Sequence, residues 1–105
     1  MTPQISVNLE SDRGSVALVG EHEAYTADKL AKHLRGLLDE GVPVVIDLRR
    51  ATFVDSTVIG VLLASQKRAN ELGLAFVPRL GDATGWPVRR ILEVTGLEAE
   101  FDVLD

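Results

Sequence analysis

The sequence predicts an α/β fold in which a mixed β-sheet of four to five strands is covered by helices. Two observations carry this prediction. Two kinds of segment alternate along the chain. Some have the alternating or continuous apolar pattern of strands, and in the others apolar residues recur at the three-and-four spacing of helices. Short stretches containing Gly or Pro separate them. The resulting order is strand, strand, helix, strand, helix, strand, helix and a short last strand, which is typical of a mixed sheet with helical cover.

The first two segments predict an antiparallel hairpin. Residues 5–10 alternate between apolar and polar side chains, as a half-buried strand does. Residues 11–14 read Ser-Asp-Arg-Gly, which is turn chemistry, and residues 15–20 are a second apolar strand. Two such runs joined by a short turn favour an antiparallel pair.

A helix and a central strand follow the hairpin. Residues 26–40 place their apolar side chains on one stripe, with Thr26 as the expected N-cap and Gly41 as the expected stop. Residues 42–48 are nearly continuous β-branched apolar sequence. Such a run is typical of a strand that is buried on both faces of its sheet.

The second half of the chain predicts two more helices and two short strands. Residues 56–72 form the second helix and residues 74–77 a strand. A polar, Gly-containing loop covers residues 79–86, and the third helix spans residues 87–95, where a proline suits the first turn. Residues 101–104 are expected to form a short last strand.

Composition bounds the class of protein. The 105 residues fit one domain, expected to span residues 1–105. The absence of cysteine excludes a disulfide framework and a thiolate metal site, and it fits a cytoplasmic protein. Eleven basic against sixteen acidic residues give a formal net charge of −5, which disfavours nucleic-acid binding. No apolar run approaches the ~20 residues that span a bilayer, so membrane insertion is not expected.

The most informative stretch is the start of the second helix, where Asp55, Ser56 and Thr57 follow a buried strand. One interpretation is that Asp55 or Ser56 caps the helix by accepting bonds from its free backbone N–H groups. The other is a phosphorylation switch at Ser56. A phosphate there would meet those N–H groups and the positive end of the helix dipole, and it would add about −1.5 to −2 charges to an acidic surface.

The apolar residues that follow Ser56 occupy more than one stripe of the helix, beginning with Val58 and Ile59. One face must pack on the sheet. The remainder either is exposed beside Ser56 as a partner-binding patch or is covered by another helix, and the sequence leaves both alternatives open.

Few residues of the sequence suggest catalysis, and no metal site or cofactor is expected. The two histidines are His22, expected on a surface loop, and His33, expected on the polar side of a helix. Glu21 and Glu23 could bind a cation, although a solvated loop is the better interpretation. An enzyme that uses Ser56 with His22 as its base is a third hypothesis, weakened by the lack of an oxyanion motif nearby.

Three motifs in order resemble the STAS domain, and most closely the bacterial anti-sigma factor antagonists. The first is Asp47-Leu48 followed by Phe53 and by Asp55-Ser56-Thr57 with Ile59-Gly60. The others are Gly20-Glu21-His22-Glu23 and the stretch from Val88 to Leu97, which reads VRRILEVTGL. The resemblance covers nearly the whole chain and implies a STAS-like mixed sheet with helices mainly on one face.

The resemblance also implies a function. The family's phosphorylated serine maps onto Ser56, and the partner surface maps onto Glu21, Glu23, Asp55, Thr57, Val58 and Ile59. The kinase would be an anti-sigma factor with a histidine-kinase-like ATPase domain, and the phosphatase a PP2C-type enzyme. Unphosphorylated antagonist would bind the anti-sigma factor and free an alternative sigma factor. The chain would then be no enzyme, and a monomer or weak dimer. The alternative is a non-switching STAS module in a lipid-transport ABC complex or another signalling assembly.

The chain departs from the family pattern at three positions. Val58 stands where the family usually has Gly and adds bulk beside the acceptor, and the sequence leaves open whether this narrows access for the kinase or marks a divergent partner. Glu23 replaces an Asp. Trp86, the single tryptophan, stands where Pro is common and is expected to cover the end of the core, with a partner anchor as the alternative.

Overall fold

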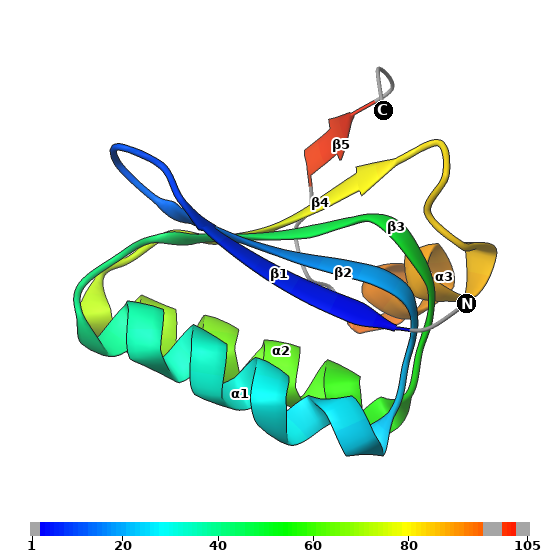
Figure 1. The fold of residues 1–105 in the computed structure, drawn as a ribbon, viewed down its shortest axis with the longest axis horizontal. Coiled ribbons are helices and arrows are strands. Elements are labelled where there is room, and N and C mark those ends of the chain that lie inside the picture. The colour runs from blue at the N-terminus through cyan, green and yellow to red at the C-terminus, as the bar shows by residue number, and fades with distance from the viewer. Residues whose placement is uncertain (1–2, 96–99, 103–105) are drawn as a thin grey trace.

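The computed structural model describes residues 3–95 and 100–102. In these residues a five-stranded sheet has the spatial order β1-β2-β3-β4-β5, the same as the order along the chain. β1 pairs with β2 in antiparallel fashion, and the pairs β2–β3, β3–β4 and β4–β5 are parallel. The predicted mixed sheet of four to five strands is therefore confirmed. Each parallel pair is joined by a crossover through a helix (Figure 1).

The element bounds agree with the sequence patterns to within a few residues at most ends. The strands are β1 Gln4–Leu9, β2 Gly14–His22, β3 Val44–Val54, β4 Phe76–Gly81 and β5 Glu100–Asp102. The helices are α1 Ala24–Asp39, α2 Ser56–Leu72 and α3 Trp86–Thr95. The bounds of α2 match the prediction at both residues. The predicted last strand is shifted, and its residues beyond Asp102 lie outside the described part of the chain.

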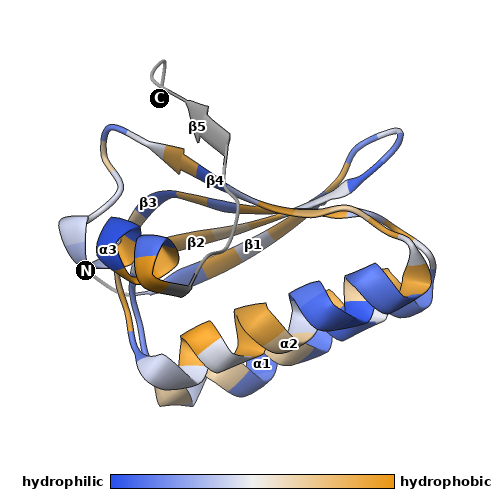
Figure 2. Cartoon of the chain, turned by 180° about the vertical axis from the view of Figure 1, so that it is seen from behind, coloured by the Kyte–Doolittle hydropathy of each residue, from blue (hydrophilic) through white to orange (hydrophobic). Residues whose placement is uncertain are grey.

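The helices pack mainly on one face of the sheet, as predicted, and one apolar core fills the space between (Figure 2). Strand residues such as Val16, Ile46 and Leu48 meet helix residues such as Leu34 and Leu62 in this core, and all five are fully buried. Burying a side chain of this size contributes roughly 1.5–3 kcal/mol. The core therefore holds α1, α2 and α3 against the same side of the sheet.

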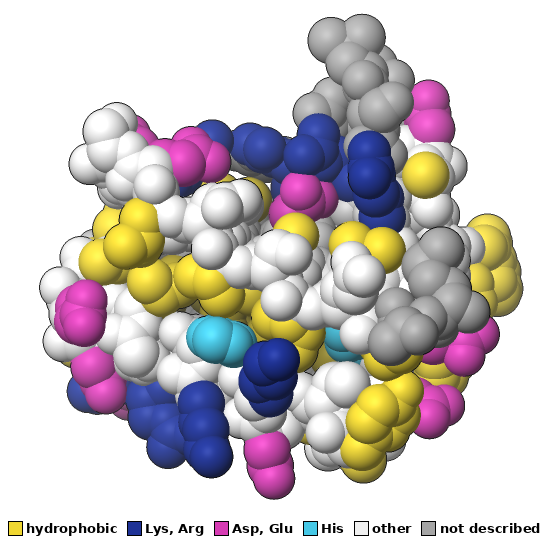
Figure 3. Space-filling view, viewed as in Figure 1, with side chains coloured by type: hydrophobic (Ala, Val, Ile, Leu, Met, Phe, Trp, Pro, Cys, Tyr) yellow, Lys and Arg dark blue, Asp and Glu magenta, His cyan; other side chains and the backbone are white. Residues whose placement is uncertain are grey.

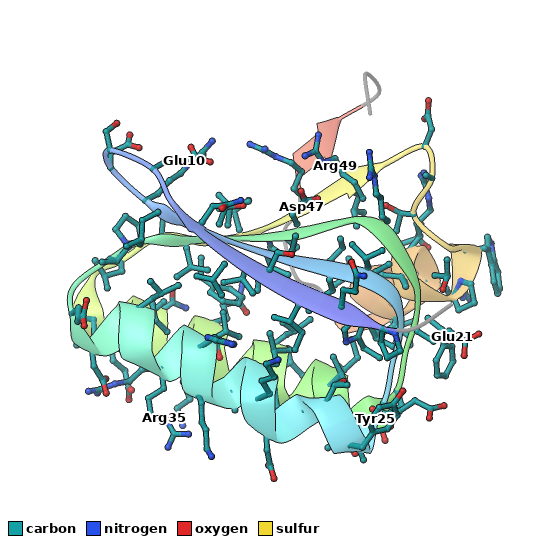
Figure 4. The ribbon with its side chains drawn as sticks, viewed as in Figure 1. Glu10, Glu21, Tyr25, Arg35, Asp47 and Arg49 are labelled. Atoms are coloured by element: carbon teal, nitrogen blue, oxygen red, sulfur yellow. The ribbon has the colours of Figure 1, made fainter. Side chains whose placement is uncertain are left out.

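The predicted burial of the central strand on both faces is confirmed at its start, where Val44, Val45 and Ile46 are all buried, but it is wrong from Asp47 on, where the face opposite the helices is open. Along β3, Leu48 is buried, whereas Asp47 and Arg49 are half-buried and point to the other face (Figure 4). β3 also runs six residues beyond its predicted end at residue 48. Its second half alternates polar with apolar side chains because only one face is covered.

The starts of all three helices lie at one end of the molecule, on the right in Figure 1. This follows from topology, because β2, β3 and β4 are parallel and each is followed by a helix that begins at its carboxyl end. We refer to this end as the helix-start edge. It gathers residues that are far apart in the sequence, including Glu23, Ser56 and Trp86.

Candidate functional site

Ser56 is the first residue of α2, and Asp55 alone separates it from the end of β3. Asp55 is the N-cap, and its Oδ1 accepts a hydrogen bond from the backbone nitrogen of Val58 at 3.0 Å. Ser56 and Thr57 are both exposed. Asp55 therefore carries the capping function, and the Ser56 hydroxyl is left at the surface without a capping bond.

The first turn of α2 offers an anion two backbone donors. The N–H of Val58 is taken by Asp55, and that of Ile59 donates to the Asp55 carbonyl oxygen at 3.0 Å. Within the described residues, the N–H groups of Ser56 and Thr57 have no such partner. Free donors at a helix start, together with the helix dipole, favour negative charge there. The geometry can hold a phosphate attached to Ser56.

The end of β2 lies beside this turn. The backbone nitrogen of Asp55 donates to the carbonyl oxygen of His22 at 3.1 Å. Glu21 and Glu23 flank His22, and both are exposed; Figure 4 shows Glu21 at this end of the molecule. Neither forms an ion pair with another described residue, so their charges face solvent. The fold thus brings the two predicted partner-binding segments together at the helix-start edge.

His22 is fully buried, which corrects the expectation of a surface loop residue. Its Nε2 lies 3.1 Å from the carbonyl oxygen of Val19, and its Nδ1 lies 3.2 Å from the hydroxyl of Thr26. Burial lowers its pKa from the ordinary value, although the carbonyl groups of Val19 and Gln4 oppose the shift. Both ring nitrogens are engaged, Nε2 within β2 and Nδ1 with Thr26 of α1. The imidazole is therefore not presented to Ser56 as a catalytic base.

Thr26 is not the N-cap of α1, which corrects a second expectation. The cap is Glu23, whose side chain makes no capping bond, and α1 begins at Ala24. Thr26 donates its hydroxyl to the Glu23 carbonyl oxygen at 3.0 Å. Thr26 thus lies inside the helix, which begins two residues earlier than predicted. Its hydroxyl contacts the ring of His22 and the first-turn carbonyl oxygen of Glu23.

Val58 and Ile59 are in the core, with relative exposures of 0% and 7%. Their side chains therefore do not form part of a partner surface, contrary to the expectation, and Val58 adds no bulk on the side where Ser56 is exposed. The alternative in which this stripe is covered by the rest of the fold is correct.

Another stripe of α2 borders a shallow groove of about 570 Å³ against α1. The groove is lined by Ala31, Arg35, Leu38, Asp39, Thr57, Gly60, Val61, Ala64, Ser65 and Arg68.

Two large aromatic side chains are exposed at the helix-start edge. Trp86, the first residue of α3, is 71% exposed, and Tyr25, the second residue of α1, is 69% exposed. The expectation that Trp86 covers the core is therefore wrong. Tyr25 was missed by sequence reasoning. The signal in the sequence that could have indicated its exposure is its position in the first turn of α1, away from the apolar stripe of that helix.

The open face of the sheet holds a separate polar cluster. Asp47 accepts hydrogen bonds from the backbone nitrogen, Nε and Nη2 of Arg49 at 2.9–3.0 Å. Burial alone would raise the pKa of Asp47, but these bonds and the charges of Arg49 and Arg79 hold it below its ordinary value. Basic side chains gather on this face around an acidic one (Figure 3), and they are arginines because the three lysines of the chain lie on α1 and α2. In this surface cluster the charge of Asp47 is therefore balanced by those of the neighbouring arginines.

Within residues 3–95 and 100–102, no group of three or more His, Cys, Asp or Glu side chains is arranged to hold a metal ion. Among the helices of that part of the chain, none is both long enough and apolar enough to cross a membrane.

Comparison with known proteins identifies the family. The family model described as "Mlab, STAS domain" matches residues 5–105. The anti-sigma-B factor antagonists of Listeria monocytogenes and Listeria innocua are each 31% identical to this chain over 102 residues, covering 89% of it and 88% of the relative. The fold is thus that of a STAS domain. The chain belongs to the STAS domain family and, within it, to the anti-sigma factor antagonists, as its motifs indicated.

Solved structures agree with the fold. An anti-sigma factor antagonist from Mycobacterium paratuberculosis is similar with a TM-score of 0.80 and 22% identity, over 99% of this chain and 89% of that one. The Bacillus cell fate determinant SpoIIAA in its phosphorylated form is similar with a TM-score of 0.76 and 14% identity, over 97% and 92% of the two chains. At these identities the likeness concerns the fold.

Proposed function

We propose that this protein is a partner-switching antagonist in the cytoplasm that binds an anti-sigma factor through the helix-start edge and is released when Ser56 is phosphorylated. The kinase is the anti-sigma factor itself, through a histidine-kinase-like ATPase domain, and a PP2C-type phosphatase resets the switch. The observation that carries the proposal is the exposed Ser56 hydroxyl on a helix turn whose cap is supplied by Asp55. The protein then acts as a substrate and a binding module, with no catalysis of its own.

Electrostatics supports release on phosphorylation. The unmodified edge already presents the carboxylates of Glu21, Glu23 and Asp55. A phosphate on Ser56 adds about −1.5 to −2 charges among them and meets the free N–H groups of the first turn. The fold can stay unchanged because those N–H groups can donate to the phosphate oxygens without breaking a bond within the protein. The surface changes instead, and an apolar or acidic docking face on the partner is repelled.

The test is phosphorylation with the cognate ATPase-type anti-sigma factor and ATP, followed by intact mass. One phosphate is expected on the wild type and none on Ser56→Ala, while Thr57→Ala is the matched control and retains it. Binding is then measured by calorimetry, where Ser56→Ala binds as wild type does and Ser56→Glu binds at least tenfold more weakly. A phosphate that persists on Ser56→Ala, or a Ser56→Glu variant that binds normally, contradicts the proposal.

A second candidate is a non-switching STAS subunit of a lipid-transport ABC complex, and the description of the matching family model as Mlab favours it. In that case the edge is a permanent docking face and Ser56 has no phosphate. Copurification from the native host separates the two candidates. A transporter ATPase that stays bound to both wild type and Ser56→Glu supports the second candidate, and an anti-sigma factor lost on Ser56→Glu supports the first.

A further inference from the structure

We propose that Trp86 and Tyr25 are the aromatic anchors of the anti-sigma factor interface, one on each side of Ser56. The partner covers them with apolar pockets whose rims carry Lys or Arg. This inference rests on the proposed function and extends its surface from the start of α2 to the starts of α1 and α3. It also explains why two large aromatic side chains are left in solvent at the edge that carries the acceptor serine.

The exposure of both side chains lacks an intramolecular reason. Trp86 is 71% exposed and Tyr25 is 69% exposed, so neither contributes much apolar burial to the fold. Each aromatic ring can bury 150–250 Å² when covered. Trp and Tyr are also the residue types that most often dominate the binding energy of protein interfaces. Their joint exposure at one edge therefore indicates a surface that another protein covers.

The backbone that presents Trp86 is fixed to the sheet. The buried Thr84 donates its hydroxyl to the Leu48 carbonyl oxygen at 3.0 Å and accepts from the Gly81 nitrogen at 2.9 Å. Gly85 donates to the Ala51 carbonyl oxygen at 2.9 Å. Trp86 follows Gly85 directly and begins α3. A residue whose backbone is held in place before binding loses less conformational entropy when a partner covers it, which favours a role as an anchor.

Gly85 lies so close to β3 that a Cβ at this position would overlap the carbonyl oxygen of Thr52. The loop that leads into α3 is therefore pressed against the second half of β3. That close approach places Trp86 at a defined point beside the strand that ends just before Ser56.

Tyr25 is positioned on the other side of Ser56, because α1 follows β2 and α3 follows β4, and these strands are the two neighbours of β3 in the sheet. It lies between Glu23, the N-cap of α1, and Thr26, whose hydroxyl lies 3.2 Å from the buried ring of His22. The carbonyl oxygen of His22 in turn accepts the bond from Asp55 at the start of α2. Figure 4 places Tyr25 and Glu21 at the same end of the molecule. One short chain of hydrogen bonds thus joins the Tyr25 turn to the Ser56 turn.

The three positions fit within one interface. Thr52, which Gly85 contacts, precedes Ser56 by four residues, a span of about 13 Å at the strand rise of about 3.3 Å per residue. A stable interface covers about 800 Å² on each partner, a patch roughly 30 Å across. Trp86, Ser56 and Tyr25 can therefore be covered by one partner at the same time.

Charge fixes the chemistry of the partner. At the same edge as the two rings, Glu21 and Glu23 expose their carboxylates, and neither forms an ion pair with another described residue. Complementary potentials favour a partner surface with Lys or Arg at this point. These basic groups face Glu21 and Glu23, whereas the partner surface opposite Ser56 is apolar. A phosphate on Ser56 would be buried there without a counter-charge, so the partner is released.

The test compares the affinity of the cognate anti-sigma factor for single variants by calorimetry. Trp86→Ala is expected to weaken binding roughly 30-fold or more, the loss typical of a hot-spot residue, and Tyr25→Ala about tenfold. Trp86→Phe is expected to retain most of the affinity. Leu9→Ala is the matched control, because Leu9 is also 71% exposed but lies on β1 next to the hairpin turn, and it binds as wild type does. Circular dichroism verifies that each variant is folded.

Trp86 also reports on the contact directly, because it is the single tryptophan of the chain. Its emission is expected to shift to shorter wavelength when a partner free of tryptophan near the interface binds, and to shift back on phosphorylation of Ser56. An unmoved emission maximum in a saturated complex contradicts the anchor.

The outcomes separate this inference from the proposed function. If wild type binds and Ser56→Glu releases, but Trp86→Ala binds equally tightly, only the anchor is wrong. If Trp86→Ala weakens binding while Ser56→Glu leaves it unchanged, the anchor stands and the switch is wrong. If wild type binds no ATPase-type anti-sigma factor, the proposed function and the anchor that rests on it are both overturned.

Discussion

The backbone nitrogen of Asp55 donates a hydrogen bond to the carbonyl oxygen of His22 at 3.1 Å, and this contact joins the start of α2 to the end of β2. His22 and Val54 are partners in the parallel β2–β3 pair, so the bond continues the ladder one residue past the strand. The side chain of Asp55 then caps α2, while that of His22 ties β2 to α1. The two residues fix the turn that presents Ser56.

The first prediction concerns the cap. Asp55→Ala removes the acceptor of the Val58 N–H bond and is expected to lower the free energy of unfolding by about 1 kcal/mol, as N-cap deletions do. Asp55→Asn keeps a capping oxygen and is expected to stay within a few tenths of a kcal/mol of wild type. Urea unfolding measures both. An equal loss in the two variants would show that charge, and not the cap, carries the effect.

The start of α2 was predictable because its signal is local. An Asp before a helix satisfies orphan N–H groups through bonds within three residues, so Asp55 and Ser56 reveal the boundary without knowledge of the rest of the fold. The two-stripe apolar pattern after it was ambiguous for the opposite reason. Whether Val58 is exposed depends on where the sheet and α1 lie, and the chain's own pattern does not contain that information.

Each misplacement depends on how the elements pack in three dimensions, which the local sequence pattern does not record. β3 continues to Val54 because one of its faces is open, so polar residues that suggest a loop alternate along a real strand. His22 is buried because its ring meets Val19 and Thr26 on two different elements. Trp86 is exposed because Thr84 and Gly85 bind β3 through residues more than thirty positions away.

The second prediction is a dependence of stability on pH through His22. Burial holds the pKa of His22 in the folded protein below its ordinary value of 6.5, so the unfolded chain binds the proton more readily. The free energy of unfolding therefore falls as the pH drops below 6.5, by at most about 1.4 kcal/mol per pH unit for this group, until the lowered pKa is passed. At higher pH this stability is fully present.

Urea unfolding at pH 7.5 and pH 5.5 measures this effect. His22→Gln is expected to lose the pH-dependent part, along with about 1–3 kcal/mol of stability at both pH values because buried hydrogen bonds are removed. His33→Gln is the matched control and is expected to keep the difference between the two pH values. A His22→Gln variant with the pH dependence of wild type would assign the titration to another group.

The third prediction uses two glycines in different surroundings. Gly85→Ala places a Cβ against the backbone of β3 at Thr52 and is expected to cost about 1–3 kcal/mol or more, because the backbone must shift. Gly60→Ala meets no atom within 4 Å on an exposed turn of α2 and is expected to stabilise by about 0.5–1 kcal/mol. Thermal unfolding compares the two. Opposite signs are expected, and a neutral Gly85→Ala would mean that the loop before α3 yields easily.

The last prediction addresses the valine that replaces the family's glycine. Val58 is fully buried, so Val58→Gly is expected to lower the free energy of unfolding by roughly 2–3 kcal/mol through a cavity and a freer helix backbone. Because its side chain faces the core, the rate of Ser56 phosphorylation is expected to change less than twofold while the variant stays folded. Val58→Ala, which loses about 2 kcal/mol, controls for stability alone. Faster phosphorylation in Val58→Gly but not in Val58→Ala would show that the valine restricts the kinase through the helix backbone.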